Sequence, residues 1–138
     1  MILKVPTPPN QKRNQSIAVL TSGGDAPGMN AAVRSVVRYG LAHGCKMYGV
    51  MKGYRGLLDG HILRLEASSV ANVIQRGGTI LKTDRCKEFY KKSARKHAAE
   101  VLKSYGIEGL VVIGGDGSFT GAGLLEKETG FPTIGVPG

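Results

Sequence analysis

Short runs of hydrophobic residues alternate along this chain with stretches in which apolar residues recur at helical spacing. The runs that we predict as strands span residues 17–20, 47–51, 110–113 and 133–136. Their apolar residues are continuous rather than alternating, which is typical of strands buried on both faces of a parallel sheet. Helical stretches separate the strands, so the pattern predicts an α/β fold: a three-layer Rossmann-like parallel sheet with helices on both faces.

Three main helices are predicted between these strands, in addition to a short helix that Ser68 or Ser69 can cap and whose apolar face is Val70, Val73 and Ile74. The first begins near Pro27, a residue suited to the first turn of a helix, and ends at Gly44. A second helix ends near Tyr105, and a third surrounds residues 121–128. The spacing in the second predicts a single apolar face that consists of Ala94, Ala98, Val101, Leu102 and Tyr105.

The pattern that follows the second predicted strand is weaker. Residues 53–56 contain two glycines and are predicted as a loop. Asp59-Gly60 is predicted to close a small hairpin between residues 57–58 and 62–65, because this dipeptide suits tight hairpin turns.

The length of 138 residues and the 41% hydrophobic content suit one domain. Residues 1–16 contain three prolines and no periodicity, so we expect a flexible amino-terminal extension before a fold over 17–138. No apolar run approaches the roughly 20 residues of a membrane span, and no signal-peptide pattern is present. The two cysteines have no metal-binding spacing. We expect a cytoplasmic protein with no membrane partner.

The formal net charge of +9 is concentrated in two places, the amino-terminal extension and a block over Lys82 to Lys96. Such a block attracts polyanions in some proteins, but here it overlaps the second predicted helix and lacks interleaved aromatic residues. We therefore interpret the basic residues as the solvated face of that helix, and we expect no nucleic-acid partner. Polyanion binding remains the alternative.

Two predicted strands run directly into glycine-rich loops that each contain Gly-Gly-Asp. The first loop is Thr21-Ser22-Gly23-Gly24-Asp25-Ala26-Pro27-Gly28, and the second is Gly114-Gly115-Asp116-Gly117-Ser118. Glycines let backbone N–H groups approach phosphate oxygens, and the helix after each loop directs its positive end towards them. Asp116 suits Mg²⁺, although a helix cap is its alternative role. The two loops together predict a nucleotide site at the carboxyl ends of the strands.

Neither a Walker A sequence nor a Gly-x-Gly-x-x-Gly fingerprint occurs in the chain, so the phosphate loop is of another type. The two loops, together with Arg76-Gly77-Gly78-Thr79, resemble the amino-terminal part of ATP-dependent 6-phosphofructokinase. The resemblance covers Ile17 to Gly138. It implies a transferase that uses ATP and Mg²⁺ in glycolysis. It also implies a nucleotide site formed by Gly24, Tyr54, Arg85, Cys86, Gly115, Asp116, Gly117 and Ser118.

Within that site the resemblance gives individual roles. Asp116 would bind Mg²⁺, and Tyr54 would lie near the nucleotide. Arg85 would be catalytic, because a guanidinium can neutralise charge that develops on the transferring phosphoryl group. Cys86 stands where the family commonly has an aromatic residue. Gly117 stands where the pyrophosphate-dependent branch has an aspartate, which favours ATP as the donor.

The resemblance also implies regulation through Arg34 and Arg38, which match the family's allosteric phosphate-binding arginines. Their i, i+4 spacing puts two like charges on one helix face, which an anion would relieve. A nucleotide or phosphoenolpyruvate is the implied effector. Further effector-site positions are occupied by Ala67 and Asn72, which depart from the family pattern.

The family's catalytic base lies in a Thr-Ile-Asp-Asn-Asp motif, which would begin directly after Gly138. Most contacts to fructose 6-phosphate and a second domain would also follow. We therefore expect this chain alone to be inactive and the full-length form to be a homotetramer. Two alternatives remain open: a Gly-Gly-Asp-Gly kinase of NAD or lipid, and a non-catalytic nucleotide-binding or regulatory module.

Overall fold

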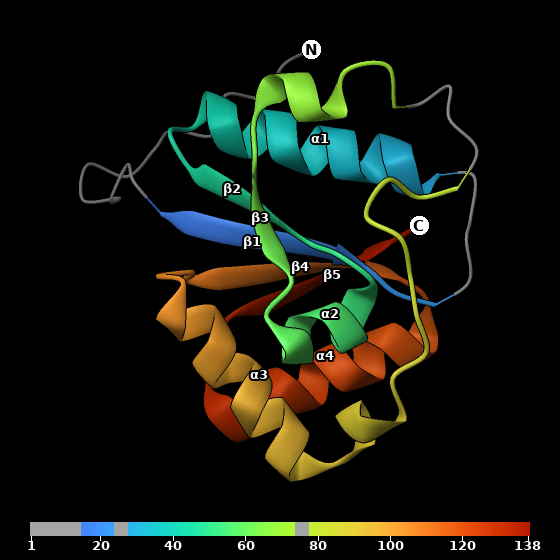
Figure 1. The fold of residues 1–138 in the computed structure, drawn as a ribbon, viewed down its shortest axis with the longest axis vertical. Coiled ribbons are helices and arrows are strands. Elements are labelled where there is room, and N and C mark those ends of the chain that lie inside the picture. The colour runs from blue at the N-terminus through green and yellow to red at the C-terminus, as the bar shows by residue number, and fades with distance from the viewer. Residues whose placement is uncertain (1–14, 24–27, 74–77) are drawn as a thin grey trace.

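The chain folds into one five-stranded sheet between two layers of helices (Figure 1). The computed structural model describes residues 15–23, 28–73 and 78–138. Most of the predicted flexible extension therefore lies outside the described residues. Its last position, Ser16, is already the first residue of a strand, and the Gln15 carbonyl accepts a hydrogen bond of 2.8 Å from the Lys46 amide.

The sheet has the order β3-β2-β1-β4-β5, with β1 at its centre. The strands are β1 (Ser16–Thr21), β2 (Lys46–Val50), β3 (Ile62–Leu65), β4 (Gly109–Gly114) and β5 (Thr133–Pro137). β1 pairs in parallel with β2 and β4, and β4 pairs in parallel with β5. β3 is antiparallel to β2, so the predicted parallel sheet is confirmed for four strands and corrected at one edge.

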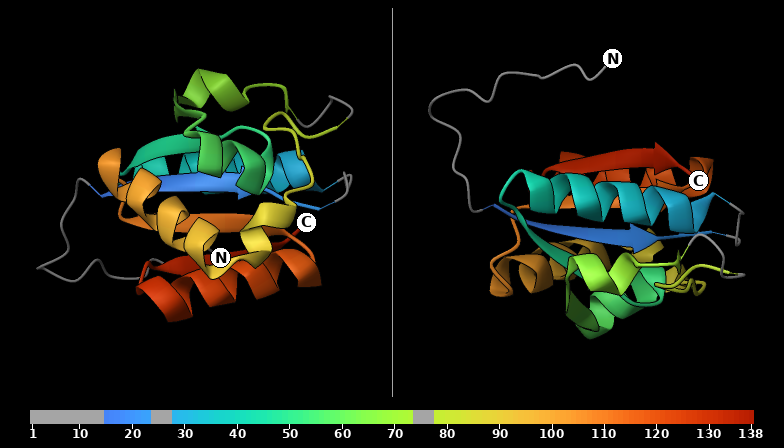
Figure 2. Two further views of the ribbon diagram at one scale, coloured as in Figure 1. Left: turned by 60° about the horizontal axis from the view of Figure 1, so that its bottom comes forward. Right: turned by 90° about the horizontal axis from the view of Figure 1, so that it is seen from above.

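Helices cover both faces of the sheet, as the three-layer prediction requires. One face carries α1 (Met29–Ala42) and the short 3-10 helix η1 (Ala67–Val70); the other carries α2 (Gly53–Asp59), α3 (Lys92–Ser104) and α4 (Asp116–Thr129). A second short 3-10 helix, η3 (Lys87–Tyr90), precedes α3. Figure 2 shows the same layers from two further sides. No helix in this described part of the chain combines the length and the apolar character needed to cross a bilayer.

The hydrophobic core has two halves, one on each side of the sheet. Val19 of β1 packs with Val33 and Val37 of α1, whereas its neighbour Leu20 packs towards α2, α3 and α4. Successive residues of a strand point to opposite faces, so a strand buried on both faces needs apolar residues at every position. This requirement explains the continuous hydrophobic runs in the sequence.

The predicted loop and hairpin around residues 53–60 are wrong. Residues Gly53 to Asp59 form α2, which ends at Gly60 with a φ of 72°. Leu57 is fully buried and Tyr54 is 7% exposed, so two side chains at i, i+3 spacing anchor the helix in the core. Their burial outweighs the low helix propensity of the two glycines.

The predicted apolar face of the second helix is also corrected. The buried residues of α3 are Arg95, Ala98, Ala99 and Leu102. Tyr105, which was expected on that face, is 43% exposed. The buried stripe is therefore rotated towards Arg95, and this arginine of the basic block does not lie on the solvated face.

Candidate functional site

The two glycine-rich loops leave the sheet side by side at the carboxyl ends of β1 and β4. Thr21 and Ile113 are paired in register, and the Ser22 amide donates a hydrogen bond of 2.9 Å to the Ile113 carbonyl. A Cβ atom added to Gly23 would lie 3.6 Å from Ser118 Oγ, which places the two loops in contact. Gly24 and Asp25 lie outside the described residues. The predicted convergence of the two loops is confirmed for their described residues.

Gly114 allows this close approach of the two loops. A Cβ atom at this position would lie 2.6 Å from the Ser22 carbonyl oxygen and 2.8 Å from Ser118 Oγ. The first of these contacts is with backbone, which cannot move aside without displacing β1. Gly114 is therefore required by the packing of the protein itself.

Gly115 and Gly117 differ from Gly114 because no atom of the described residues lies within 4 Å of a Cβ atom added to either of them. Both residues are exposed, as is Asp116 between them. The first intrahelical bond of α4 runs from the Phe119 amide to the Gly115 carbonyl, and the amides of the first turn have no partner within the helix. These glycines thus leave open space above a helix amino-terminus, where a phosphate group fits.

Asp116 is the first residue of α4, and the preceding position, Gly115, supplies no side-chain cap. Across the described ranges no three His, Cys, Asp or Glu side chains gather as a metal site. This arrangement fits Mg²⁺, which usually takes one or two carboxylates and completes its octahedron with water and substrate phosphate oxygens.

Tyr54 supports the second loop from inside the core. Its hydroxyl donates a hydrogen bond of 2.7 Å to the Ser118 carbonyl, and its ring stacks on Phe89 with centroids 3.8 Å apart and planes 11° apart. Burial raises the pKa of the Tyr54 hydroxyl above its ordinary value, so it stays a donor. Gly121 makes room for this stack, since a Cβ there would lie 3.2 Å from the Phe89 ring.

The segment that carries Arg85 crosses the same end of the sheet. The Thr21 hydroxyl donates a hydrogen bond of 3.0 Å to the Lys82 carbonyl, and the Lys52 amide donates one of 2.8 Å to Leu81. In Figure 1 this yellow-green segment passes from the layer of α1 to the layer of α4. Arg85 is exposed, three residues beyond the carbonyl that Thr21 holds.

Asn30 fixes the beginning of that segment, a role that the sequence motifs do not predict. Its side chain is 4% exposed, its Nδ2 donates to the Gly78 carbonyl at 2.6 Å, and its Oδ1 accepts from the Ile80 amide at 2.8 Å. A polar residue among the apolar positions that begin α1 was the available signal. Such a residue must find partners when it is buried.

Cys86 and Glu88 follow Arg85 in a turn that contacts α2. Cys86 is half-buried, and burial raises the pKa of its thiol. Glu88 forms an ion pair of 2.6 Å with Arg55. The pKa of Glu88 is lowered, first by a hydrogen bond from its own backbone N–H and further by Arg55.

Arg34 and Arg38 lie one turn apart on α1, across the sheet from α4. Arg38 is exposed, whereas Arg34 is half-buried, and its Nε is buried without a hydrogen-bond partner among the residues that the structure describes. η1, which begins at Ala67, packs against α1. Among the described residues neither arginine is hydrogen-bonded to the loop of residues 114–118, and their predicted effector role stays a prediction.

A surface cavity of about 470 Å³ lies between α3 and the end of α4, away from the predicted site residues. Its lining includes Lys92, Lys96 and Lys103, which share the wall with Glu100 and Glu128. The two carboxylates offset only part of this positive charge, because Glu128 is paired with Arg95. The cavity contains none of the residues predicted to bind a nucleotide.

Residues 16–138 match the family model described as Phosphofructokinase. The ATP-dependent 6-phosphofructokinase of Thermoanaerobacter sp. (strain X514) is 59% identical over 124 residues, covering 90% of this chain and 39% of that protein. The ATP-dependent 6-phosphofructokinase of Clostridium botulinum (strain Hall) is 60% identical over the same length and with the same coverage. The chain thus spans 39% of the length of these curated relatives.

Solved structures share the fold. The phosphofructokinase of Pichia pastoris in the T-state superposes with a TM-score of 0.86 and 42% identity, covering 96% of this chain and 16% of that one. The Saccharomyces cerevisiae phosphofructokinase gives a TM-score of 0.82 and 40% identity, covering 90% and 20% of the two chains. A pyrophosphate-dependent phosphofructokinase from Marinobacter aquaeolei is 20% identical, with a TM-score of 0.71 over 89% of this chain and 32% of that one, which shows a common fold alone.

Proposed function

This chain belongs to the phosphofructokinase family, and we propose that it forms the Mg-ATP-binding part of an ATP-dependent 6-phosphofructokinase. The full-length protein then transfers the γ-phosphoryl group of ATP to fructose 6-phosphate, giving fructose 1,6-bisphosphate and ADP in glycolysis. Because the chain spans 39% of its relatives' length, this activity is proposed for the full-length form. The chain alone is proposed to bind Mg-ATP without turning it over.

The observation that carries this proposal is the open space at Gly115 and Gly117. Among the residues that the structure describes, no atom lies within 4 Å of a Cβ added at either position, yet both are glycine beside an exposed carboxylate at the start of a 14-residue helix. An occupant from outside the chain explains this better than packing does. A polyphosphate fits, because it needs close access to the backbone N–H groups.

Each residue of the site has a proposed part in this function. The amides of Gly115 to Ser118 would hold the phosphate groups, with Gly24 contributing from the first loop. Asp116 would hold Mg²⁺, which on binding neutralises phosphate charge and orients the γ-phosphoryl group. Exposed Arg85 would face the charge that develops on that group during transfer. Tyr54 would hold the loop in place from the core through its hydrogen bond to the Ser118 carbonyl, while Cys86 would lie beside the nucleotide.

The open position at Gly117 supports ATP rather than pyrophosphate as the donor. An aspartate there would place a negative charge in the space that an inner phosphate of the nucleotide would occupy, and the two charges would repel. Glycine leaves the space free. The names of the two bacterial relatives agree with this choice of donor.

The place of Gly138 supports a catalytic base that follows it. Its amide donates a hydrogen bond of 3.3 Å to the Gly114 carbonyl, and a Cβ added to Gly28 would lie 3.5 Å from its carbonyl carbon. A segment that continues from Gly138 would start between the two loops. We place the Thr-Ile-Asp-Asn-Asp motif there in the full-length form, which we propose to be a homotetramer. Arg34 and Arg38 would bind the phosphate of an effector.

Calorimetry with Mg-ATP on this chain tests the proposal, and α4 offers a matched pair of glycines. Gly117 and Gly123 both have open space around a Cβ atom, but only the former lies in the first turn. We expect binding by the parent chain, weaker binding by Gly117→Ala and unchanged binding by Gly123→Ala. Absence of heat from the parent chain, or equal affinity of the two variants, would overturn the proposal.

A further inference from the structure

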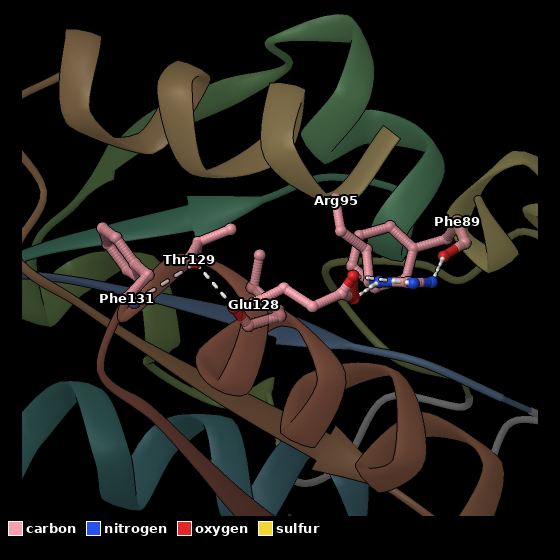
Figure 3. Close-up of polar contacts among 6 residues, drawn as sticks. Phe89, Arg95, Glu128, Thr129 and Phe131 are labelled. Atoms are coloured by element: carbon pink, nitrogen blue, oxygen red, sulfur yellow. Dashed lines mark hydrogen bonds and ion pairs between the residues drawn. The ribbon is translucent and has the colours of Figure 1, made fainter. Parts of the chain in front are cut away.

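Arg95 is a buried member of an otherwise exposed basic block. Its side chain is 8% exposed and that of its partner Glu128 is 14% exposed. Arg95 Nε and Nη2 donate to the two carboxylate oxygens of Glu128, the second at 3.0 Å (Figure 3). A two-point pair of this kind holds both side chains in one orientation.

The same guanidinium makes a third contact, which an ion pair between two helices does not require. Arg95 Nη1 donates a buried hydrogen bond of 2.8 Å to the Phe89 carbonyl (Figure 3). Phe89 belongs to η3, the turn that follows Cys86 and Arg85. Arg95 therefore fastens this turn to the end of α4 through Glu128.

Phe89 also connects the turn to the first turn of α4, at the other end of that helix. Its ring, 5% exposed, stacks on Tyr54, and the Tyr54 hydroxyl holds the Ser118 carbonyl in the first turn of α4. The contacts thus run from Glu128 through Arg95, Phe89 and Tyr54 back to the helix that begins at Asp116. The turn of residues 86–90 is clamped against both ends of one helix.

We propose that Arg95 is a positioning residue of the phosphoryl-donor site, which fixes the turn of residues 86–90 and thereby sets Arg85, Cys86 and Tyr54 against the loop of residues 115–118. The proposal rests on the function proposed above. Arg95 acts on the site through Phe89 and does not itself contact the nucleotide. Glu128 orients Arg95, and the Phe89 carbonyl transmits the effect.

A purely structural role is the competing explanation, in which the pair holds α3 against α4. The two explanations differ in the Phe89 contact. Well-packed apolar residues can replace a buried ion pair with little loss of stability, but they cannot donate to a carbonyl. The double variant Arg95→Met, Glu128→Leu therefore keeps helix packing and removes the hold on the turn.

Cys86 provides a reporter within the turn. In a Cys45→Ser background it is the remaining thiol, since the chain has two cysteines. The thiolate is the reacting species, and Cys86 is half-buried, so release of the turn will speed its alkylation. The experiment measures the alkylation rate with iodoacetamide, the Mg-ATP dissociation constant and the unfolding temperature for each variant.

We expect Arg95→Lys, Glu128→Gln and the double variant each to raise the Cys86 alkylation rate several-fold and to weaken Mg-ATP binding several-fold. The matched control is Thr129→Val, which removes hydrogen bonds to Leu125 and Phe131 at the same helix end but has none to the turn (Figure 3). It should lower the unfolding temperature without changing either readout at temperatures where it is folded.

Two results would contradict the hold of Arg95 on the turn of residues 86–90. One is an alkylation rate in the double variant equal to that of the parent, and the other is equal acceleration by Thr129→Val. If the alkylation rates change as expected but the parent chain binds no Mg-ATP, the clamp on the turn stands and the proposed nucleotide function fails. If the rates change while Mg-ATP affinity stays the same in every variant, Arg95 fixes the turn but is not a positioning residue of the donor site, and the proposal is overturned.

Discussion

The two ends of α4 carry the same kind of charge in opposite surroundings. At its start, Asp116 is exposed between two glycines that have open space around them. At its end, Glu128 is largely buried, with both carboxylate oxygens bonded to Arg95. The fold itself satisfies the second carboxylate and leaves the first available. This difference separates residues that the fold needs from residues that a ligand would need, on a single helix.

Replacing Asp116 or Glu128 by alanine should show most clearly how the two ends of α4 differ. Asp116→Ala is expected to weaken Mg-ATP binding about tenfold or more, a loss of roughly 1.4 kcal/mol or more, with little change in unfolding temperature. Glu128→Ala is expected to lower the unfolding temperature, because it leaves the Arg95 charge buried without its partner. Calorimetry and thermal unfolding measure the two effects. A similar loss of stability in both variants would contradict the distinction.

The glycines of the second loop give a matched pair for stability. Gly114→Ala is expected to cost about 1–3 kcal/mol of unfolding free energy, because its Cβ would collide with the Ser22 carbonyl oxygen. Gly117→Ala is expected to be neutral or slightly stabilising, since alanine favours a helix over glycine by about 0.5–1 kcal/mol. Urea unfolding measures both. Equal destabilisation would mean that Gly117 is also held by packing.

Tyr54 links the packed interior to the open loop, so a change there should affect both properties moderately. Tyr54→Phe keeps the stack on Phe89 and removes the hydrogen-bond donor to the Ser118 carbonyl. We expect it to lower the free energy of unfolding by about 1 kcal/mol. A small loss of Mg-ATP affinity should accompany it. Tyr105→Phe is a control, because it also loses a tyrosine hydrogen bond to a carbonyl, at Gly60, but far from the loop. Equal effects of the two variants on Mg-ATP affinity would contradict the proposed role of Tyr54 in the site.

Acid should act on the end of α4 through Glu128. Hydrogen bonds from Arg95 hold the pKa of Glu128 below its ordinary value, so its contribution to stability is complete above the unfolded pKa of about 4.3 and is lost as pH falls through the folded pKa. Glu128→Gln should therefore be less stable than the parent at neutral pH and should approach it in acid. Thermal unfolding between neutral pH and pH 3 checks this, and a constant difference would contradict it.

The sequence predicted the parts of the fold that follow from periodicity. The continuous runs at 17–20 and 110–113 gave β1 and β4, and the Gly-Gly-Asp loops after them placed the candidate site at the carboxyl edge of the sheet. Parallel neighbours must end at the same edge, so the convergence of the loops followed from the pattern. The family match over residues 16–138 agrees with the resemblance carried by these motifs.

Other features depended on tertiary contacts. α2 escaped prediction because its glycines resemble a loop, while the burial of Leu57 and Tyr54 decides the outcome. The cluster of basic residues favours a solvated face for Arg95, although its spacing from Ala98 and Leu102 fits the apolar stripe of α3. A charged residue can be buried in such a stripe when an oppositely charged side chain pairs with it. Here that partner is Glu128, which lies 33 residues away in the sequence. Pattern alone does not reveal that partner.

The most direct test of the open helix start is backbone amide NMR of this chain during titration with Mg-ATP. We expect the amide resonances of residues 115–118 to shift saturably and those of residues 126–130, at the packed end of the same helix, to stay in place. Uniform shifts along α4, or saturable shifts confined to its packed end, would contradict the claim that its first turn is the phosphate site.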